Sequence, residues 1–265
     1  MMLQIECRAK INLYLRVTGK RPDGFHDLIT LFREIDLADT LEWQPDSTPL
    51  SLEVIGADLG NPEENLVVRA ARRFGELTGF HAGGAIRLHK KIPAGGGLGG
   101  GSSNAAGMVK LLNRHYQNPL DQRGLIKLCS ELGSDVPFFL QGGRQLGTGR
   151  GVDLKPVSEP ESEPRQGFLF LPPMGLSTAA IFGVCHPGPD HPAEVGRNDL
   201  LPAALEVSAS FAKIWNILEK NFEAPFFMTG SGSTLVWLTT NRQIAPKKCK
   251  LLEDIGVSWV PFCFW

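Results

Sequence analysis

A glycine-rich stretch is the part of the sequence whose residue types most directly suggest chemistry. It runs from Ile92 to Ala106, IPAGGGLGGGSSNAA, and has glycine at every position from 95 to 101 except Leu98. Glycines let consecutive backbone N–H groups form a concave anion site, and the small residues that follow begin a helix whose N-terminus faces the same point. A phosphate group is the natural occupant, and we expect a side chain at Gly97 to take up the space of that phosphate.

Three explanations of this stretch compete on the residues alone. A flexible surface loop would tolerate the glycines, but such linkers do not usually separate a clear strand from a clear helix. Gly95, Gly97 and Gly100 satisfy the GxGxxG dinucleotide pattern, yet the acidic residue expected about 20 positions later at a strand end is missing. The segment from Gly96 to Gly101 has the spacing of a Walker loop, but Ser102 stands where the lysine should be.

Two polar side chains lie side by side on a predicted strand near the start of the chain. The odd positions from Leu3 to Val17 are apolar and the even ones are polar or amphipathic. This alternation predicts a long strand with one buried face. Lys10 and Asn12 therefore project from the exposed face, where a solvated lysine is the ordinary outcome.

The other predicted elements place the glycine-rich stretch between a strand and a helix. We expect an apolar-rich segment at 28–41, a strand at 86–90, two apolar strands around 228–233, and helices over 64–77, 105–112, 121–132 and 205–222. The proline- and glutamate-rich segment 156–164 is the best candidate boundary, which divides the chain into domains 1–157 and 158–265. This mixture favours a two-domain α+β protein over a regular β-α-β winding.

The composition excludes several classes of function. The formal net charge of −1, from 27 basic and 28 acidic residues, gives no electrostatic footprint for a nucleic acid. The five cysteines are odd in number and lack a CxxC pair, so neither a disulfide framework nor a zinc cluster is indicated. Charged residues interrupt any signal-peptide core, and two prolines break the apolar stretch 167–185. We expect a cytoplasmic protein without nucleic-acid or membrane partners, either a monomer or a homodimer.

Several motifs together resemble the GHMP kinases, the superfamily of galactokinase, homoserine kinase, mevalonate kinase and phosphomevalonate kinase. The string PAGGGLGGGSSNAA is similar to the ATP-binding motif of that family. In this form it resembles the branch that phosphorylates 4-diphosphocytidyl-2-C-methyl-D-erythritol in non-mevalonate isoprenoid synthesis. The strings AKINL from Ala9, RPDGFH from Arg21, GSDVPFF from Gly133 and MTGSGS from Met228 support the same assignment, in the order of the family.

The resemblance implies a fold and a nucleotide. The fold is the two-domain GHMP kinase fold, with an N-terminal domain like the second domain of ribosomal protein S5, a C-terminal ferredoxin-like domain, and the active site in the cleft between them. The cofactor is ATP with Mg²⁺, whose ligands the sequence does not indicate. The residues implied for ATP binding are Pro93, Ala94, Gly95, Gly96, Gly97, Leu98, Gly99, Gly100, Gly101, Ser102, Ser103 and Asn65. For Asn65, which precedes a predicted helix, a capping role is an equally good interpretation.

The resemblance also implies two catalytic residues. Asp135 is the candidate base, and Lys10 lies beside it, where its charge compensates the carboxylate and the transferring group. On local sequence alone, the Asp135-Val136-Pro137 order favours a helix N-cap instead. The turn at Gly230 to Gly232 is expected to pack against the phosphate loop without a catalytic role.

Four residues are implied for binding a small-molecule substrate, a cytidine diphosphate-linked methylerythritol. They are Asn12, Phe25, His26 and Phe182, with the two phenylalanines sandwiching cytosine and His26 bonding to its edge. The family usually has tyrosine where this chain has Phe25, which keeps a stacking face and removes a hydroxyl. A surface position for His26 and a core position for Phe182 are the ordinary alternatives.

The implied function is ATP-dependent phosphorylation of the 2-hydroxyl of this substrate. Another member of the superfamily, acting on homoserine, mevalonate or a sugar, is the first alternative, and the RPDGFH string argues against it. A non-catalytic nucleotide-binding relative is the second alternative. The presence of both Lys10 and Asp135 argues against that one.

Overall fold

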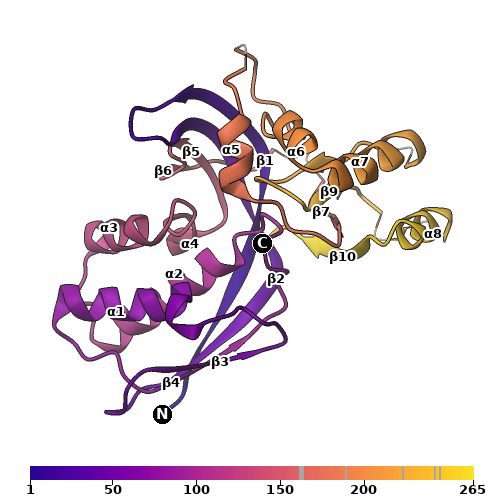
Figure 1. Ribbon diagram of the computed structural model, residues 1–265. Helices are drawn as coiled ribbons and strands as arrows, with labels where there is room; N and C mark the ends of the chain where they lie inside the picture. The colour runs from indigo at the N-terminus through magenta and orange to yellow at the C-terminus, as the bar shows by residue number, and fades with distance from the viewer. Residues whose placement is uncertain (161–163, 189, 223, 242, 245) are drawn as a thin grey trace. The chain divides into compact units, whose positions relative to one another are not determined.

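Two long strands are the first elements of the computed structural model. They are β1 (Leu3–Lys20) and β2 (His26–Gln44), drawn in indigo and violet in Figure 1. The structure describes residues 1–160, 164–188, 190–222, 224–241, 243–244 and 246–265. The chain divides into two compact units, and each long strand contributes residues to both. Unit 1 comprises residues 1–10, 37–94 and 99–142, and unit 2 comprises residues 11–36, 95–98 and 143–265.

The predicted domain boundary rests on the segment 156–164. Residues 161–163 of this segment lie outside the described residues. The division into domains 1–157 and 158–265 therefore stays a prediction.

Unit 1 combines strands with a group of helices. Its remaining elements are β3 (Ser51–Ile55), the 3-10 helix η1 (Pro62–Glu64), α1 (Leu66–Thr78), β4 (Ala85–His89), α2 (Gly100–His115), α3 (Gln122–Leu132) and α4 (Phe138–Gln141). β3 runs parallel to β4, and β4 pairs antiparallel with residues 40–44 of β2. Helices α1, α2 and α3 contact one another and form a layer beside these strands (Figure 1).

Capping residues explain where the helices of unit 1 begin and end. Asp121 accepts a hydrogen bond from the backbone N–H of Gly124 at the start of α3, and Gly133 follows its last residue. Helix α1 ends at Thr78, and its C-cap is Gly79, whose φ of 75° lies in the left-handed region that favours glycine. The helices predicted at 64–77, 105–112 and 121–132 are thus present, as α1, α2 and α3.

Unit 2 contains a four-stranded antiparallel sheet with helices. Its elements are β5 (Arg144–Gly149), β6 (Asp153–Pro156), β7 (Gln166–Leu171), α5 (Thr178–Val184), α6 (Leu201–Val207), α7 (Ala209–Asn221), β8 (Phe227–Met228), β9 (Leu235–Leu238), α8 (Pro246–Asp254) and β10 (Ser258–Cys263). The sheet has the order β10-β7-β9-β8, while β5 pairs with residues 28–33 of β2. A core of large apolar side chains, including Phe168, Phe170, Phe211 and Phe222, stabilises the unit.

Two expectations from the sequence are wrong. The polar face predicted for β1 is exposed at Gln4 and Glu6 but not at Lys10 and Asn12, which are both buried beside polar partners. The single helix predicted at 205–222 is interrupted at Ser208, which separates α6 from α7. Ser208 is extended, with φ −132° and ψ 100°, and its hydroxyl accepts a bond from the backbone N–H of Phe211, so it is the N-cap of α7.

The stretch 167–185, which is apolar but broken by prolines, forms β7 and α5. Among the described residues, no helix has the length and apolar character needed to cross a membrane.

Candidate active site

The glycine-rich stretch leads directly into the N-terminus of α2. Gly99, at φ 71°, is the N-cap, and no side chain caps the helix among the described residues. The first amides of a helix have no partner within it, and the helix dipole places partial positive charge at this end. No acidic residue lies in the first turn of α2. The amides of Gly100, Gly101 and Ser102 can therefore donate to an anion.

At Gly99 and Gly100 the protein's own atoms leave no room for a side chain. A Cβ at Gly99 would lie 2.8 Å from the ring of Phe139 and 3.1 Å from Cγ of Lys10. A Cβ at Gly100 would lie 2.9 Å from the Ile92 side chain. These distances are below ordinary van der Waals contact, so in unit 1 the glycines allow close packing around the start of α2.

The glycines of the stretch that belong to unit 2, Gly95 and Gly97, differ in how much space a side chain would find. A Cβ at Gly97, where φ is 76°, would meet the carbonyl oxygen of Thr229 at 2.9 Å and that of Gly232 at 3.1 Å. The expectation that a side chain at Gly97 would take the space of a phosphate is wrong, because backbone fills that space. At Gly95 the nearest atom to a Cβ is 3.7 Å away, and Gly95 is exposed.

The turn of the late motif contacts the glycine-rich stretch, as expected. The N–H of Thr234 donates to the carbonyl oxygen of Gly96 at 3.4 Å. The turn itself is fixed by Asn198, whose side-chain amide donates to the carbonyl oxygens of Met228 and Gly230, both at 2.8 Å. Residues 95–98 therefore pack against an ordered turn.

Lys10 and Asp135 form an ion pair within unit 1. Nζ of Lys10 lies 3.1 Å from Oδ2 of Asp135, and the two side chains are 4% and 38% exposed. The ammonium is thus fixed in the interior while the carboxylate remains accessible to another molecule. Asp135 does not cap α4, because the N-cap of that helix is Pro137 and no side chain bonds to it among the described residues.

Asn12 lies in unit 2, within a buried hydrogen-bond network. Its side-chain amide donates to the hydroxyl of Thr30 at 2.7 Å, and that hydroxyl donates to the carbonyl oxygen of Tyr14. Its backbone N–H donates to the hydroxyl of Thr229 at 2.7 Å. Asn12 therefore links β1 to β2 and to the late motif.

His26 and Phe182 lie together in unit 2. Their ring centroids are 5.2 Å apart, with an angle of 31° between the planes. Nε2 of His26 is buried and has no hydrogen-bond partner among the described residues. Burial, together with the charge of Lys20, lowers the pKa of His26 below its ordinary value. A neutral imidazole with an unpaired nitrogen is suited to a polar group of a ligand.

Phe25, which precedes His26 in the sequence, lies at the surface. It is 47% exposed, and the guanidinium carbon of Arg150 lies 3.5 Å from its ring centroid. The turn before it is closed by Arg21, which bonds to Asp23 and Asp27 and lowers the pKa of the Asp23 carboxyl. One face of the Phe25 ring is therefore covered by a cation.

The chain is similar to known kinases along its whole length. A family model for the N-terminal domain of GHMP kinases matches residues 65–143. A relative from Pelotomaculum thermopropionicum, named 4-diphosphocytidyl-2-C-methyl-D-erythritol kinase, is 37% identical and aligns over 97% of this chain and 98% of its own length. The chain belongs to the 4-diphosphocytidyl-2-C-methyl-D-erythritol kinase family. A relative of the same name from Syntrophus aciditrophicus is 34% identical over 99% of this chain and 98% of its own length.

Solved structures agree with this family. That of a 4-(cytidine 5'-diphospho)-2C-methyl-D-erythritol kinase matches with a TM-score of 0.77 and 30% identity, over 98% of this chain and 99% of its own. That of a homoserine kinase from Cytophaga hutchinsonii has a TM-score of 0.69 at 18% identity, and shows the fold alone. The predicted GHMP kinase fold and the predicted class, an ATP-dependent small-molecule kinase, are confirmed. The use of ATP follows from membership of the family.

Of its two predicted roles, capping a helix and binding ATP, Asn65 has the capping role in the structure. Its side-chain oxygen accepts a bond from the backbone N–H of Val67 at 3.0 Å, which makes it the N-cap of α1. The amide nitrogen of the same side chain is not used in this cap. Binding of ATP by Asn65 stays a prediction.

Sequence reasoning missed two residues, Arg150 and Asp39, that contact residues of the family motifs in space. Arg150 lies between Gly149 and Gly151, both with positive φ, in the turn from β5 to β6. Asp39 is a fully buried carboxylate within β2, bonded to both ends of the glycine-rich stretch. The glycines around Arg150 and the charge of Asp39 within an apolar-rich segment were the available signals.

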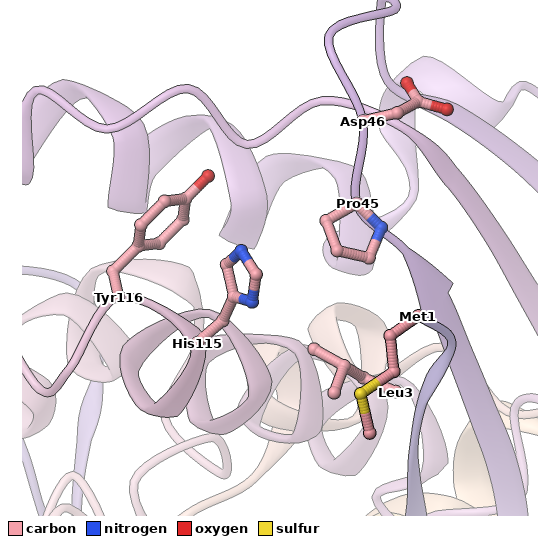
Figure 2. Close-up of a pocket in the computed structure, with 6 residues that line it drawn as sticks. All are labelled: Met1, Leu3, Pro45, Asp46, His115 and Tyr116. Carbon is pink, nitrogen blue, oxygen red and sulfur yellow. The ribbon is translucent and has the colours of Figure 1, made fainter.

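A pocket of about 420 Å³ lies elsewhere in unit 1 (Figure 2). Its lining residues are Met1, Leu3, Pro45, Asp46, His115 and Tyr116. His115 ends α2, so the pocket lies at the opposite end of this helix from the glycine-rich stretch. No predicted site residue lines it.

Proposed function

We propose that the chain transfers the γ-phosphoryl group of ATP to the 2-hydroxyl of 4-diphosphocytidyl-2-C-methyl-D-erythritol, giving the 2-phosphate and ADP in non-mevalonate isoprenoid synthesis. The observation that carries the proposal is the ion pair between Lys10 and Asp135, in which a buried cation lies against an accessible carboxylate. The names of relatives that match nearly the whole chain support the substrate.

The triphosphate binds along residues 93–103. The uncapped amides at the start of α2 donate to phosphate oxygens, and the exposed residues Ala94, Gly95 and Gly101 leave room for them. Mg²⁺ neutralises charge on the phosphates when bound. Its ligands would come mainly from the phosphates and water, because no group of three or more His, Cys, Asp or Glu among the described residues could bind a metal.

Asp135 accepts the proton of the substrate hydroxyl. As the hydroxyl oxygen bonds to the γ-phosphorus, the bond from that phosphorus to the β–γ bridging oxygen breaks and ADP leaves with the electron pair. The transition state of phosphoryl transfer is loose, so the position of the hydroxyl matters more than the strength of the base. A carboxylate fixed by an ion pair provides such a position.

Lys10 stabilises the charge that develops during transfer. Its Nζ lies 3.1 Å from the Asp135 carboxylate, and its side chain is buried, so the ammonium does not reorganise as the reaction proceeds. A fixed cation in a site that excludes water stabilises charge more strongly than one in solvent. Lys10 thereby orients the base and compensates the transferring group.

Phe25, His26 and Phe182 recognise the cytosine. The exposed ring of Phe25 offers a stacking face, and the unpaired Nε2 of His26 offers a partner to the edge of the base. Asn12 lies with Thr30 and contributes to substrate binding from β1. The enzyme works in the cytoplasm, as a monomer or homodimer, without nucleic-acid or membrane partners.

The experiment that tests the proposal is an ADP-release assay over a panel of alcohols. The panel contains the cytidine diphosphate-linked methylerythritol, its uridine analogue, homoserine and mevalonate. We expect kcat/KM to be highest for the cytidyl substrate, by at least about tenfold over the uridyl analogue, because a mismatched base leaves polar groups unpaired. Equal values for the two nucleotide substrates, or greater activity on homoserine or mevalonate, would contradict the proposed substrate.

A further inference from the structure

One buried carboxylate joins the two ends of the glycine-rich stretch. Asp39 is 0% exposed, and its Oδ1 accepts bonds from the backbone N–H groups of Lys91 at 2.7 Å and Ile92 at 2.8 Å. Its Oδ2 accepts a bond from the side-chain amide of Asn104 at 2.9 Å. Lys91 and Ile92 lie at the start of the stretch, and Asn104 lies near its end, in α2. The 11-residue segment 93–103 is therefore flanked on both sides by residues that bond to one side chain.

Lys90 balances the charge of this carboxylate. Its ammonium forms an ion pair with Asp39 and donates to Oδ1 of Asn104 at 3.2 Å. A Cβ at Gly100 would lie 3.2 Å from the same ammonium, so the pair lies directly beneath the first turn of α2. All of these residues belong to unit 1, and the network is therefore a feature of that unit alone.

We propose that Asp39 is a positioning residue of the ATP site. Glycine loses more conformational entropy on ordering than any other residue, so a segment with this many glycines binds phosphate tightly only if its ends are already fixed. Asp39 fixes both ends at once. The inference rests on the proposed binding of ATP by residues 93–103, and it does not depend on which alcohol is phosphorylated.

The substitution Asp39→Asn breaks this link selectively. The new side-chain oxygen still accepts bonds from the amides of Lys91 and Ile92. The new amide nitrogen faces the donors of Lys90 and Asn104, so the connection to α2 is lost. We expect the Kd of a non-hydrolysable ATP analogue with Mg²⁺, measured by calorimetry, to rise at least about tenfold, because the ligand must then order a segment that the wild-type protein holds in place.

Asp199→Asn provides a matched control. The Asp199 carboxylate is also largely buried, accepts a bond from the backbone N–H of Val17 at 3.0 Å and pairs with His191. Among the described residues, its hydrogen bonds and ion pairs go to Val17, His191, Arg197 and Leu15, none of which lies in residues 93–103. We expect this variant to lose thermal stability while its analogue Kd stays within about twofold of wild type.

Steady-state kinetics separate positioning from general damage. In Asp39→Asn the KM for ATP should rise while the KM for the cytidyl alcohol stays within about twofold. A merely structural defect would lower the active fraction and leave both KM values unchanged. Folded Asp39→Asn with the analogue Kd of wild type would overturn the proposal.

Asn104→Ala tests the same link if Asp39→Asn does not fold. It removes the bond to α2 and retains the ion pair of Lys90 with Asp39, so it leaves no unpaired buried charge. We expect its analogue Kd to rise about threefold, and a wild-type Kd in this variant would overturn the proposal. Wild-type protein that binds the analogue but does not phosphorylate the cytidyl alcohol would refute the proposed substrate and leave the comparison of Asp39 variants valid.

Discussion

The Lys10–Asp135 pair of unit 1 and the aromatic residues Phe25, His26 and Phe182 of unit 2 differ in whether their polar groups already have partners within the protein. The charges of Lys10 and Asp135 are matched to each other before any substrate arrives. His26 instead keeps a buried nitrogen without a partner among the described residues, and Phe25 leaves much of its ring exposed. The proposed reacting groups are thus arranged by the protein alone, whereas the proposed recognition groups are completed by a ligand. Substitutions in the first region should affect turnover, and those in the second should affect affinity and selectivity.

The largest expected effect comes from Asp135→Asn. An amide cannot accept the hydroxyl proton, so kcat should fall about a thousandfold while the affinity for ATP stays near that of wild type. Single-turnover kinetics and calorimetry measure the two quantities. Glu131→Gln is the control, because Glu131 forms an exposed ion pair with Arg73 in the same unit and should leave kcat unchanged. More than about a tenth of wild-type turnover in Asp135→Asn would refute the assignment of the base.

Lys10→Met should have the next largest effect. Methionine approximates the length of the buried stem, which packs near Gly99, and removes only the charge. We expect kcat to fall at least about a hundredfold, since the fixed cation no longer stabilises the transferring group. Turnover equal to that of wild type would show that Lys10 serves packing alone.

The contrast between Lys10 and α3 shows what the sequence can predict. The start and end of α3 follow from Asp121 and Gly133, which act on amides within a few residues of themselves. The burial of Lys10 depends on Asp135, and that of Asn12 on Thr229, which are distant in the sequence. Alternation along one strand cannot reveal partners that only the fold supplies. The motifs identified the family, yet Asp39 lies outside them. Its partners are two backbone N–H groups and the side chains of Lys90 and Asn104, which only the fold brings to it.

His26→Ala should change selectivity more than turnover. The KM for the cytidyl substrate should rise about tenfold and the preference over the uridyl analogue should shrink, because the edge of the base loses its partner. The KM for ATP should not change, and this provides the internal control. A cytidine preference that survives the substitution would remove His26 from base recognition.

The pH dependence tests the same residue. Burial lowers the pKa of His26, so the imidazole is neutral near pH 7 and gains a proton only below its ordinary pKa of about 6.5. The unfolded chain takes up this proton first as the pH falls, so the free energy of unfolding contributed by His26 decreases below about pH 6.5. The cytidine preference of wild type should shrink in the same direction, whereas that of His26→Ala should not depend on pH in this range.

Gly97 and Gly95 should differ although their backbones are alike. Both have positive φ, at 76° and 74°, so alanine strains each by about 1 kcal/mol. Only the Gly97 side chain would meet the backbone of Thr229 and Gly232. We expect Gly97→Ala to lower the free energy of unfolding by about 3 kcal/mol and Gly95→Ala by about 1 kcal/mol. Equal losses in urea unfolding would show that the late turn yields to the new side chain.

The smallest expected effect separates the two roles of Asn65. Asn65→Ala removes the N-cap of α1 and should lower the free energy of unfolding by about 1 kcal/mol. Asn65→Asp keeps an oxygen for the N–H of Val67 and should leave stability near that of wild type, but it replaces the amide nitrogen that the cap does not use. If this nitrogen donates to the nucleotide, the KM for ATP should rise about threefold in both variants, which is the cost of one neutral hydrogen bond. A stable Asn65→Asp with the wild-type KM for ATP would reduce Asn65 to a cap and remove it from the ATP site.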